Sequence, residues 1–435
     1  PAVDETLLLG RLLDFRDAPR DDDPGAVRYE PDGALLIRGG RIAAAGPCAV
    51  VEPLAGPSAA RIDHRPHLIL PGFIDAHIHF PQARVIGSWG AQLLDWLEGY
   101  VFPEEARFRD PALAARMAGA FLDELLRHGT TTAAVFCSVH PESVAALFAE
   151  ARARDMRLIA GKVMMDRNAP EDLRDDPQRG YDETKALIEA WHGRGRLLYA
   201  ISPRFAITSS EAQMEAAGAL IAERPDLHVQ THLSENRDEI AFTLSLFPFA
   251  RDYADVYARY GMLGPRSLMG HCVHLSAREI GALAEAGSVA VFNPTSNLFL
   301  GSGLLDLPRL EAGGVATAVA TDVGAGTSYS MLATMDAAYK ILQLQGAKLA
   351  PLEAFFRMTL GNARALGLAD RIGSLEPGRE ADLVVLDLCA TPAMRLRAET
   401  VESLAEELFV LQTMGDDRAV AQTYVAGRPA KPPTS

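Results

Sequence analysis

The feature that most constrains the fold is an eightfold recurrence of a short apolar segment followed by a helix-like segment. The apolar segments, several of them rich in β-branched residues, lie at 67–80, 131–139, 158–165, 197–205, 228–233, 267–274, 288–293 and 316–323. Near-continuous apolar runs are typical of parallel strands that are covered on both faces. Eight strand–helix repeats therefore favour an α/β fold with a closed, TIM-like (β/α)8 barrel over an open, doubly wound sheet.

Amphipathic helices are predicted between these strands. Asp110 followed by Pro111 matches a helix N-cap with proline at the first position, and Gly129 matches a helix-ending glycine. Between these signals an apolar stripe recurs every four residues, at Leu113, Met117, Phe121 and Leu125. Further helices are predicted at 141–155, 181–193, 209–224, 276–287 and 328–345.

The two ends of the chain have a different character. Residues 1–66 are strand-like and turn-like, and Gly39-Gly40 gives a hairpin signal between 35–38 and 41–45. Strand-like segments return at 381–388 and 422–426. We therefore expect a barrel domain at 67–374, inserted between the two parts, 1–66 and 375–435, of a smaller β-sandwich-like module.

Composition narrows the class of partner. The chain has 57 acidic and 42 basic residues and a net charge of −15, so it lacks the basic surface that nucleic acids or anionic membranes attract. No apolar run approaches the roughly 20 residues of a membrane span, and the acidic start has no features of a secretory leader. The four cysteines are far apart and form no C-x-x-C pair. These features predict a cytoplasmic protein with reduced thiols.

A histidine pair marks the end of the first predicted strand. Asp75, His77 and His79 alternate along it, so all three are predicted to point into the barrel. Two imidazoles at this spacing can share one metal ion, although the H-x-H pattern alone is a weak signal.

Further ligand candidates fall on other predicted strands. His232 closes the fifth strand, His271 lies in the sixth and Asp322 is near the end of the eighth. Barrel enzymes build their active sites from the carboxyl ends of several strands. Three neutral imidazoles and a carboxylate suit zinc or iron(II) with an open position for water, whose pKa such an ion lowers to about 7.

Several polar residues have competing interpretations. Glu235 is either a solvated residue at a helix start or a proton shuttle, and its place three residues after His232 favours the shuttle. Asp322 could instead cap a turn. His274 is predicted to pack rather than to bind metal. Surface or packing roles are predicted for His64, His67, His128, His140 and His192.

Longer motifs carry a family resemblance. The segment PGFIDAHIH at 71–79 is similar to the first-strand signature of the amidohydrolase superfamily. Within that superfamily, the chain resembles the branch that deaminates guanine. This closer resemblance depends on FPQ at 80–82, LLDWL at 93–97, GKVMMDRNAP at 161–170, SPRF at 202–205, THLSEN at 231–236, HCVHL at 271–275, PTSNL at 294–298 and TDVGAGT at 321–327.

The resemblance implies an activity, a metal site and an assembly. The activity is hydrolysis of guanine by a metal-activated water to xanthine and ammonia, a step of purine breakdown and salvage, in a homodimer. One divalent ion per subunit, zinc or alternatively iron(II), is expected on His77, His79, His232 and Asp322. The implied catalytic residues are Glu235 as proton shuttle, with His271 and Asp322 beside the water. The implied purine-binding residues are Gln82, Arg204 and Phe205.

The side-chain chemistry agrees with these roles. A guanidinium such as Arg204 donates hydrogen bonds to a carbonyl edge, whereas the Gln82 amide both donates and accepts. Phe205 offers ring surface to a flat base, although core packing explains it equally well. Attack on the carbon bearing the amino group needs a strong nucleophile and protonation of the adjacent ring nitrogen. Glu235 is expected to carry that proton.

Three other functions stay open. Another aminohydrolase could act on adenine-type, pterin or triazine rings, but Gln82 with Arg204-Phe205 disfavours this. A binuclear amidase usually has a bridging lysine at the end of the fourth strand, where this chain has Ser202-Pro203-Arg204. A non-catalytic scaffold is disfavoured because all four candidate ligands are present.

The connection after the first strand is unusually long. It spans 81–110 and contains two of the three tryptophans, Trp89 and Trp96. Loops of this length in compact domains are often lids or interface elements. We expect this segment to cover the purine site and to contribute to the dimer contact.

Overall fold

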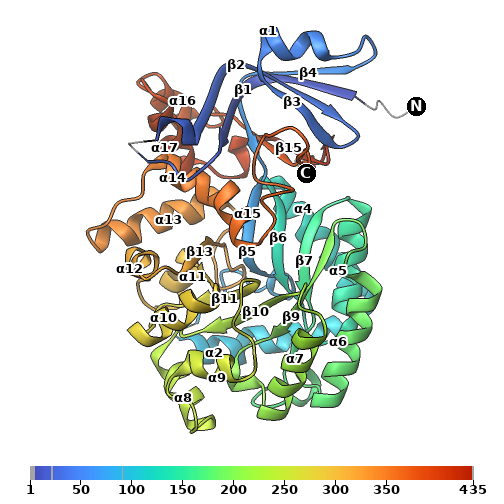
Figure 1. The fold of residues 1–435 in the computed structure, drawn as a ribbon, viewed down its shortest axis with the longest axis vertical. Coiled ribbons are helices and arrows are strands. Elements are labelled where there is room, and N and C mark those ends of the chain that lie inside the picture. Colours follow the sequence, from blue (N-terminus) through green and yellow to red (C-terminus); the bar gives the residue numbers. More distant parts are fainter. Residues whose placement is uncertain (1–4, 21–22, 91, 434–435) are drawn as a thin grey trace.

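The computed structural model describes residues 5–20, 23–90 and 92–433. A sheet built from both chain ends lies at one end of the molecule, and the barrel with its helices forms the rest (Figure 1). Eight parallel strands follow one another around the barrel, which confirms the predicted fold class. They are β5 (Phe73–His79), β6 (Thr130–Phe136), β7 (Arg157–Gly161), β9 (Leu197–Pro203), β10 (His228–Leu233), β11 (Ser267–His271), β12 (Val289–Phe292) and β13 (Ala316–Val319). A short β8 (Val163–Met164) also pairs with β9.

The predicted helices are present around the barrel. They are α4 (Pro111–Arg127), α5 (Pro141–Ala153), α6 (Pro177–Trp191), α7 (Glu211–Glu223), α10 (Ala277–Ala286) and α13 (Met331–Leu344). The Asp110 carboxylate accepts a hydrogen bond from the Ala112 N–H, as the N-cap signal predicts. Helices that the patterns did not predict are α8 (Arg237–Leu246), α9 (Tyr253–Arg259), α11 (Pro294–Phe299), α12 (Leu307–Ala312), α14 (Pro351–Phe356), α15 (Asn362–Ala365), α16 (Pro392–Ala398) and α17 (Leu404–Met414). No helix in the described part of the chain has the length and apolarity to cross a bilayer.

The module at the chain ends is one seven-stranded sheet in the order β16-β15-β14-β4-β1-β2-β3. Its strands are β1 (Glu5–Phe15), β2 (Val27–Arg38), β3 (Arg41–Pro47), β4 (Ala60–Pro71), β14 (Leu383–Leu386), β15 (Val420–Val425) and β16 (Arg428–Pro429). The turn between β2 and β3 is the predicted Gly39-Gly40 hairpin, with positive φ at both glycines. Pairing of β4 with β14 joins the N-terminal and C-terminal parts.

The first predicted strand, 67–80, is wrong in one respect, because it is two strands in different sheets. β4 ends at Pro71 and β5 begins at Phe73. The Gly72 N–H bonds to the Asp382 carbonyl beside the small sheet, and the next N–H bonds to the Gly129 carbonyl beside the barrel. A Cβ on Gly72 would lie 2.2 Å from Thr131 Oγ1, so the crossing point requires glycine. The domain limits 1–66, 67–374 and 375–435 stay a prediction. β4 of the small sheet extends past the first of these limits, to Pro71.

A side chain closes the barrel at its seam. In place of a ladder between β5 and β13, the Asn362 amide nitrogen donates to the carbonyls of Ile74 (2.6 Å) and Val319 (2.8 Å), and its oxygen accepts the Val319 N–H (2.9 Å). Nearer the carboxyl ends of the strands, the Asp322 N–H donates to the His77 carbonyl at 2.9 Å. The seam thus holds the first and last strands in register below the site.

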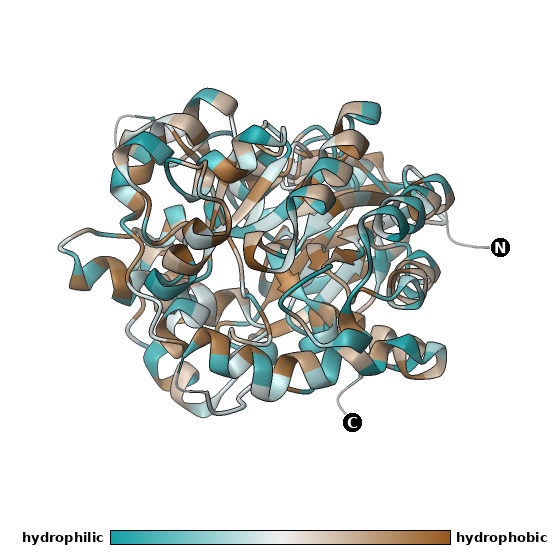
Figure 2. Cartoon of the chain, turned by 90° about the horizontal axis from the view of Figure 1, so that it is seen from below, coloured by the Kyte–Doolittle hydropathy of each residue, from teal (hydrophilic) through white to brown (hydrophobic). Residues whose placement is uncertain are grey.

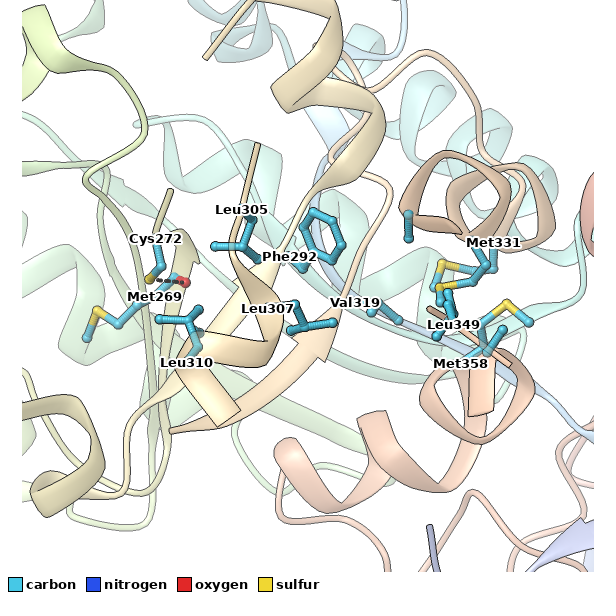
Figure 3. Close-up of a cluster of buried hydrophobic side chains, with 14 of the residues drawn as sticks. Met269, Cys272, Phe292, Leu305, Leu307, Leu310, Val319, Met331, Leu349 and Met358 are labelled. Atoms are coloured by element: carbon cyan, nitrogen blue, oxygen red, sulfur yellow. Dashed lines mark hydrogen bonds between the residues drawn. The ribbon is translucent and has the colours of Figure 1, made fainter. Parts of the chain in front are cut away.

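Buried side chains fill the space between the strands and their helices. Seen from the end away from the small sheet, apolar strand segments are surrounded by helices with mixed hydropathy (Figure 2). Figure 3 shows one region, where Phe292 and Val319 of two neighbouring strands lie among side chains of the surrounding helices and loops. A separate apolar cluster inside the barrel includes Ile74, Ile159 and Leu268 together with Leu366 and Ile372, which follow Asn362. This packing closes the amino end of the barrel and leaves the carboxyl end for a site.

Candidate active site

Five predicted side chains meet at the carboxyl ends of the strands. One ligand atom from each of His77, His79 and His232 lies within 4.8 Å of the others, and the same holds for His77, His271 and Asp322. All five side chains are buried. The strand positions inferred from sequence therefore bring the histidines and the aspartate together in one cluster.

Irregular backbone at the strand ends places these groups. Ser234, His271 and Asp322 have φ values of 52°, 72° and 53°, in the left-handed region. Such residues cost about 1–3 kcal/mol each and gather at functional sites. In β5, the pairing with β6 shifts register between Asp75 and Ile78, which interrupts the alternation of side chains.

Asp75 does not belong to the ligand groups found among the described residues. The Asp75 carboxylate instead accepts hydrogen bonds from the backbone N–H of Thr321 (3.1 Å) and from its hydroxyl (2.5 Å). Asp75 therefore ties the first strand to the segment that presents Asp322, outside the ligand cluster.

Hydrogen bonds fix the orientation of two imidazoles. The Nδ1–H of His232 donates to the Arg204 carbonyl at 2.6 Å, and the Nδ1–H of His271 donates to Asn297 Oδ1 at 2.9 Å. Each bond leaves Nε2 facing the centre of the cluster. Metal-binding histidines are commonly held in this way, because the outer bond selects the tautomer that leaves a lone pair free.

The donor set fits a divalent metal ion. His79 Nε2 lies 3.2 Å from His232 Nε2, and Asp322 Oδ1 lies 3.3 Å from His77 Nε2 and 3.5 Å from His79 Nε2. Both ring nitrogens of His77 are buried without a hydrogen-bond partner. Burial lowers the pKa of His77, His79 and His232, so these rings are neutral. Three neutral imidazoles around one carboxylate match a mononuclear zinc or iron(II) site.

Glu235 lies beside the cluster and not on a solvated surface. Its Oε2 is 3.3 Å from His271 Nε2, and its Oε1 accepts a hydrogen bond from the Ser302 hydroxyl at 2.8 Å. Burial raises the pKa of Glu235. Burial opposes protonation of His271, but the carboxylates of Glu235 and Asp322 outweigh it and raise the pKa of that imidazole. A carboxyl group and an imidazole poised in this way can exchange protons with a bound molecule.

Asp322 stays ionised beside these groups. Burial opposes ionisation of its carboxyl group, but its contact with His77 and the charge on His271 lower its pKa to about 2. The carboxylate is therefore available as a metal ligand and as a hydrogen-bond acceptor over the whole neutral range.

A cavity of about 380 Å³ opens beside the cluster and brings in the predicted substrate-binding residues. Gln82, Arg204 and Phe205 all line it together with His79, Glu235 and Asp322. Phe205 is buried and its ring centre is 6.4 Å from that of His232, so it both packs and faces the cavity.

The long connection after β5 lines part of this cavity. It contains η3 (Phe80–Gln82), α2 (Leu93–Trp96), the π-helical turn η4 (Leu97–Val101), α3 (Phe102–Glu105) and η5 (Ala106–Arg109). Leu93, Trp96 and Leu97 line the cavity. Trp96 is only 2% exposed, whereas Trp89 is 79% exposed. The segment therefore contributes to the wall of the cavity and presents one tryptophan outwards, and its role as a cover stays a prediction.

Most of the other histidines lie away from the cluster. His274 does not reach it, since its Nε2–H donates to the Ser302 carbonyl at 2.7 Å. In the described ranges, none of the histidines given surface or packing roles, namely His64, His67, His128, His140 and His192, joins a ligand group.

Sequence reasoning missed three functional neighbours: Glu105, Asn297 and Ser302. Glu105 is completely buried and contacts both Gln82 and Arg204. A signal for it exists, because Leu97, Val101 and Glu105 follow one another at helical four-residue spacing. An acidic residue on an otherwise apolar helical stripe indicates a buried partner.

Comparisons with known proteins agree with this geometry. Residues 68–430 match the family model described as the amidohydrolase family. The guanine deaminase of Escherichia coli (strain K12) is 50% identical over 404 residues, which cover 93% of this chain and 92% of that one. The solved structure of E. coli guanine deaminase superposes with a TM-score of 0.94 at 46% identity, over 98% of both chains. A guanine deaminase from C. acetobutylicum, solved with guanine in its active site, gives a TM-score of 0.89 at 29% identity, over 98% of this chain and 99% of that one.

A family match over more than half of the chain and a relative with half of its residues in common lead to one conclusion. The chain belongs to the amidohydrolase family.

Proposed function

We propose that this chain hydrolyses guanine to xanthine and ammonia. The observation that carries the proposal is that buried Gln82 and Arg204 open onto the same cavity as the five-residue ligand cluster. The name of the E. coli relative, which shares 50% of residues over 93% of this chain, supports the same substrate. A purine bound against these two side chains lies within reach of the metal ligands.

We propose His77, His79, His232 and Asp322 as the ligands of one divalent ion, with zinc favoured and iron(II) as the alternative. When bound, such an ion lowers the pKa of a coordinated water to about 7 and so supplies a nucleophile at neutral pH. The nitrogen-rich set with one carboxylate suits zinc and leaves a position open.

The protein groups bind the base and move protons. Arg204 donates hydrogen bonds to the ring carbonyl, and Gln82 donates and accepts along the same edge. Phe205 contacts the ring surface. Glu235 takes a proton from the attacking water and passes it to the ring nitrogen next to the reacting carbon. The proton of the added hydroxyl then passes to the amino group, the carbon–nitrogen bond breaks, and ammonia leaves as the new carbonyl of xanthine forms. His271 and Asp322 orient the water and stabilise the tetrahedral intermediate.

Donor placement favours guanine over adenine-type rings. The Arg204 guanidinium has five N–H donors and no acceptor. A ring carbonyl pairs with such a group, whereas an exocyclic amino group in the same place faces another donor. Deamination is therefore expected for a base whose ring carbonyl faces Arg204 in the cavity.

The wider context of the activity also belongs to this proposal. We propose a homodimer in the cytoplasm that acts in purine breakdown and salvage, with the 81–110 segment as both a lid and part of the dimer contact. The outward-facing Trp89 on that segment supports the second role. Size-exclusion chromatography of the wild type and of a Trp89→Ser variant tests it, because loss of the contact would shift the variant towards monomer.

One assay tests the activity. Ammonia release from guanine, adenine, cytosine and pterins is measured on a sample of known metal content. Xanthine formation from guanine alone, lost on chelation, supports the proposal. Activity confined to another ring overturns it.

A further inference from the structure

We propose that Glu105 is a positioning residue that fixes which hydrogen-bonding groups Gln82 and Arg204 present to the base, and so selects a ring carbonyl. The inference rests on the proposed function, because it assumes that these two side chains bind the purine. Glu105 does not line the cavity itself. It acts through the residues that do.

One carboxylate holds both side chains. Glu105 Oε1 accepts a hydrogen bond from Gln82 Nε2 at 3.0 Å, and its Oε2 accepts one from Arg204 Nη1 at 2.7 Å. The three side chains are at most 3% exposed. Because water is excluded, these charge-assisted bonds act in a low-dielectric surrounding and fix geometry strongly.

The amide of Gln82 has only one orientation that satisfies its neighbours. Its Oε1 accepts the backbone N–H of Gly324 at 3.2 Å, while its Nε2 donates to Glu105. A carboxylate can only accept and a backbone N–H can only donate, so a flipped amide would lose both bonds. Gln82 therefore keeps one N–H and one oxygen lone pair for the base, at fixed positions.

Arg204 is also held by α3, the helical turn that carries Glu105. Its guanidinium carbon lies 5.6 Å from the centre of the Phe102 ring, and Phe102 and Glu105 are the two ends of α3. The Ser138 hydroxyl donates to the Glu105 backbone carbonyl at 3.0 Å, which attaches this turn to the segment after β6. The negative charge of Glu105 also offsets the positive charge of the buried Arg204 guanidinium, which lies beside the proposed metal site.

Selectivity follows from this rigidity. Paired with Glu105, Arg204 is held as a set of donors, and the fixed Gln82 amide cannot rotate to present its oxygen in place of its nitrogen. A base with a carbonyl at this edge is bound, and a base without an acceptor there leaves buried donors unpaired. Loss of the carboxylate would free both side chains and weaken this discrimination.

The test compares two ligands that the enzyme cannot deaminate. Hypoxanthine carries the ring carbonyl without the amino group, and purine carries neither. In Glu105→Gln, the dissociation constant for hypoxanthine is expected to rise by about tenfold or more, the factor for one misplaced hydrogen bond to a charged group, and that for purine to change by less than about threefold. Equal changes for the two ligands, or no change for hypoxanthine, would overturn the proposal.

The matched control is Glu104→Gln. Glu104 is the neighbouring carboxylate on α3, but it pairs with Arg84 at 2.6 Å and not with a cavity residue. It is expected to bind both ligands as the wild type does. If Glu105→Gln does not fold, Glu105→Asp replaces it, since the shorter carboxylate keeps its charge yet cannot span both partners and should also weaken hypoxanthine binding selectively.

Turnover separates this inference from the proposed function. Wild-type conversion of guanine to xanthine tests the function, whatever the variants do. With that activity present and the metal content equal, Glu105→Gln is expected to raise KM for guanine more than it lowers kcat. A fall in kcat alone would place Glu105 outside substrate positioning and overturn the inference.

Discussion

The Nε2 atoms of His79 and His232 lie 3.2 Å apart, and the His232 proton is on the other ring nitrogen, which donates to the Arg204 carbonyl. Burial keeps both rings neutral. The two Nε2 atoms are within hydrogen-bond distance of each other and close enough to bind one shared cation.

Metal removal is therefore expected to cost both activity and stability. A ligand present at 1,000 times its dissociation constant stabilises the folded state by about 4 kcal/mol. Chelated protein should show a lower Tm by calorimetry and no xanthine formation, and added Zn²⁺ should restore both. Full activity in protein shown by elemental analysis to be metal-free would contradict the ligand assignment.

Glu235→Gln should separate chemistry from metal binding. The amide keeps the size of the side chain but cannot take up a proton, so we expect a fall in kcat of about 10²–10⁴-fold, the usual contribution of a general acid–base group. Metal content should be unchanged, because the proposed ligands are intact. A rate near that of the wild type would remove Glu235 from the proton path.

The pH profile reports on the pair formed by Glu235 and His271. Burial raises the pKa of Glu235, and the charge on His271 opposes that rise. A proton acceptor must be ionised, so kcat/KM should decline as the pH falls through the pKa of Glu235. In His271→Asn the opposing charge is gone, and the acid limb of the residual activity should move to higher pH. An unchanged limb, or one at lower pH, would be inconsistent with their coupling.

Gly270 provides a steric test of the site. A Cβ on this residue would lie 2.6 Å from Cε1 of the His77 ring. Gly270→Ala should therefore displace His77 and lower the bound metal per subunit, measured by elemental analysis. Gly281→Ala is the control, since a Cβ there meets nothing within 4 Å and the α10 interior should gain about 0.5–1 kcal/mol in unfolding free energy. Equal metal contents in the two variants would argue against this packing.

Much of the barrel could be predicted from sequence because its strands are buried on both faces. The strand at 228–233 has the predicted limits. The same reasoning failed at Gly72, where one apolar run passes from the small sheet to the barrel. Hydrophobicity records burial, but it does not record which sheet buries a segment.

The residues of the ligand cluster could be predicted from their positions at strand ends, but the residues that support them could not. His232, His271 and Asp322 are on strands or just after them, where a periodic pattern predicts a common face. Glu105 and Asn362 lie on short helices, and they bond to groups that are far from them in the sequence. Glu105 is 99 residues from Arg204, and Asn362 is 288 residues from Ile74. Such contacts have no local signature in the sequence.

The dependence of the seam on Asn362 sets an order for folding during synthesis. The ribosome delivers β5 and β13 before residue 362, so the first and last strands of the barrel emerge before their Asn362 bonds can form. Unpaired strand edges invite association with other chains. Release of the remaining polypeptide adds the Asn362 bonds to those that Asp322 and Val323 make across the seam, and supplies β14, the partner of β4. A nascent chain truncated before this residue is expected to be a client of chaperones, whereas one only slightly longer can begin to bury its own edges.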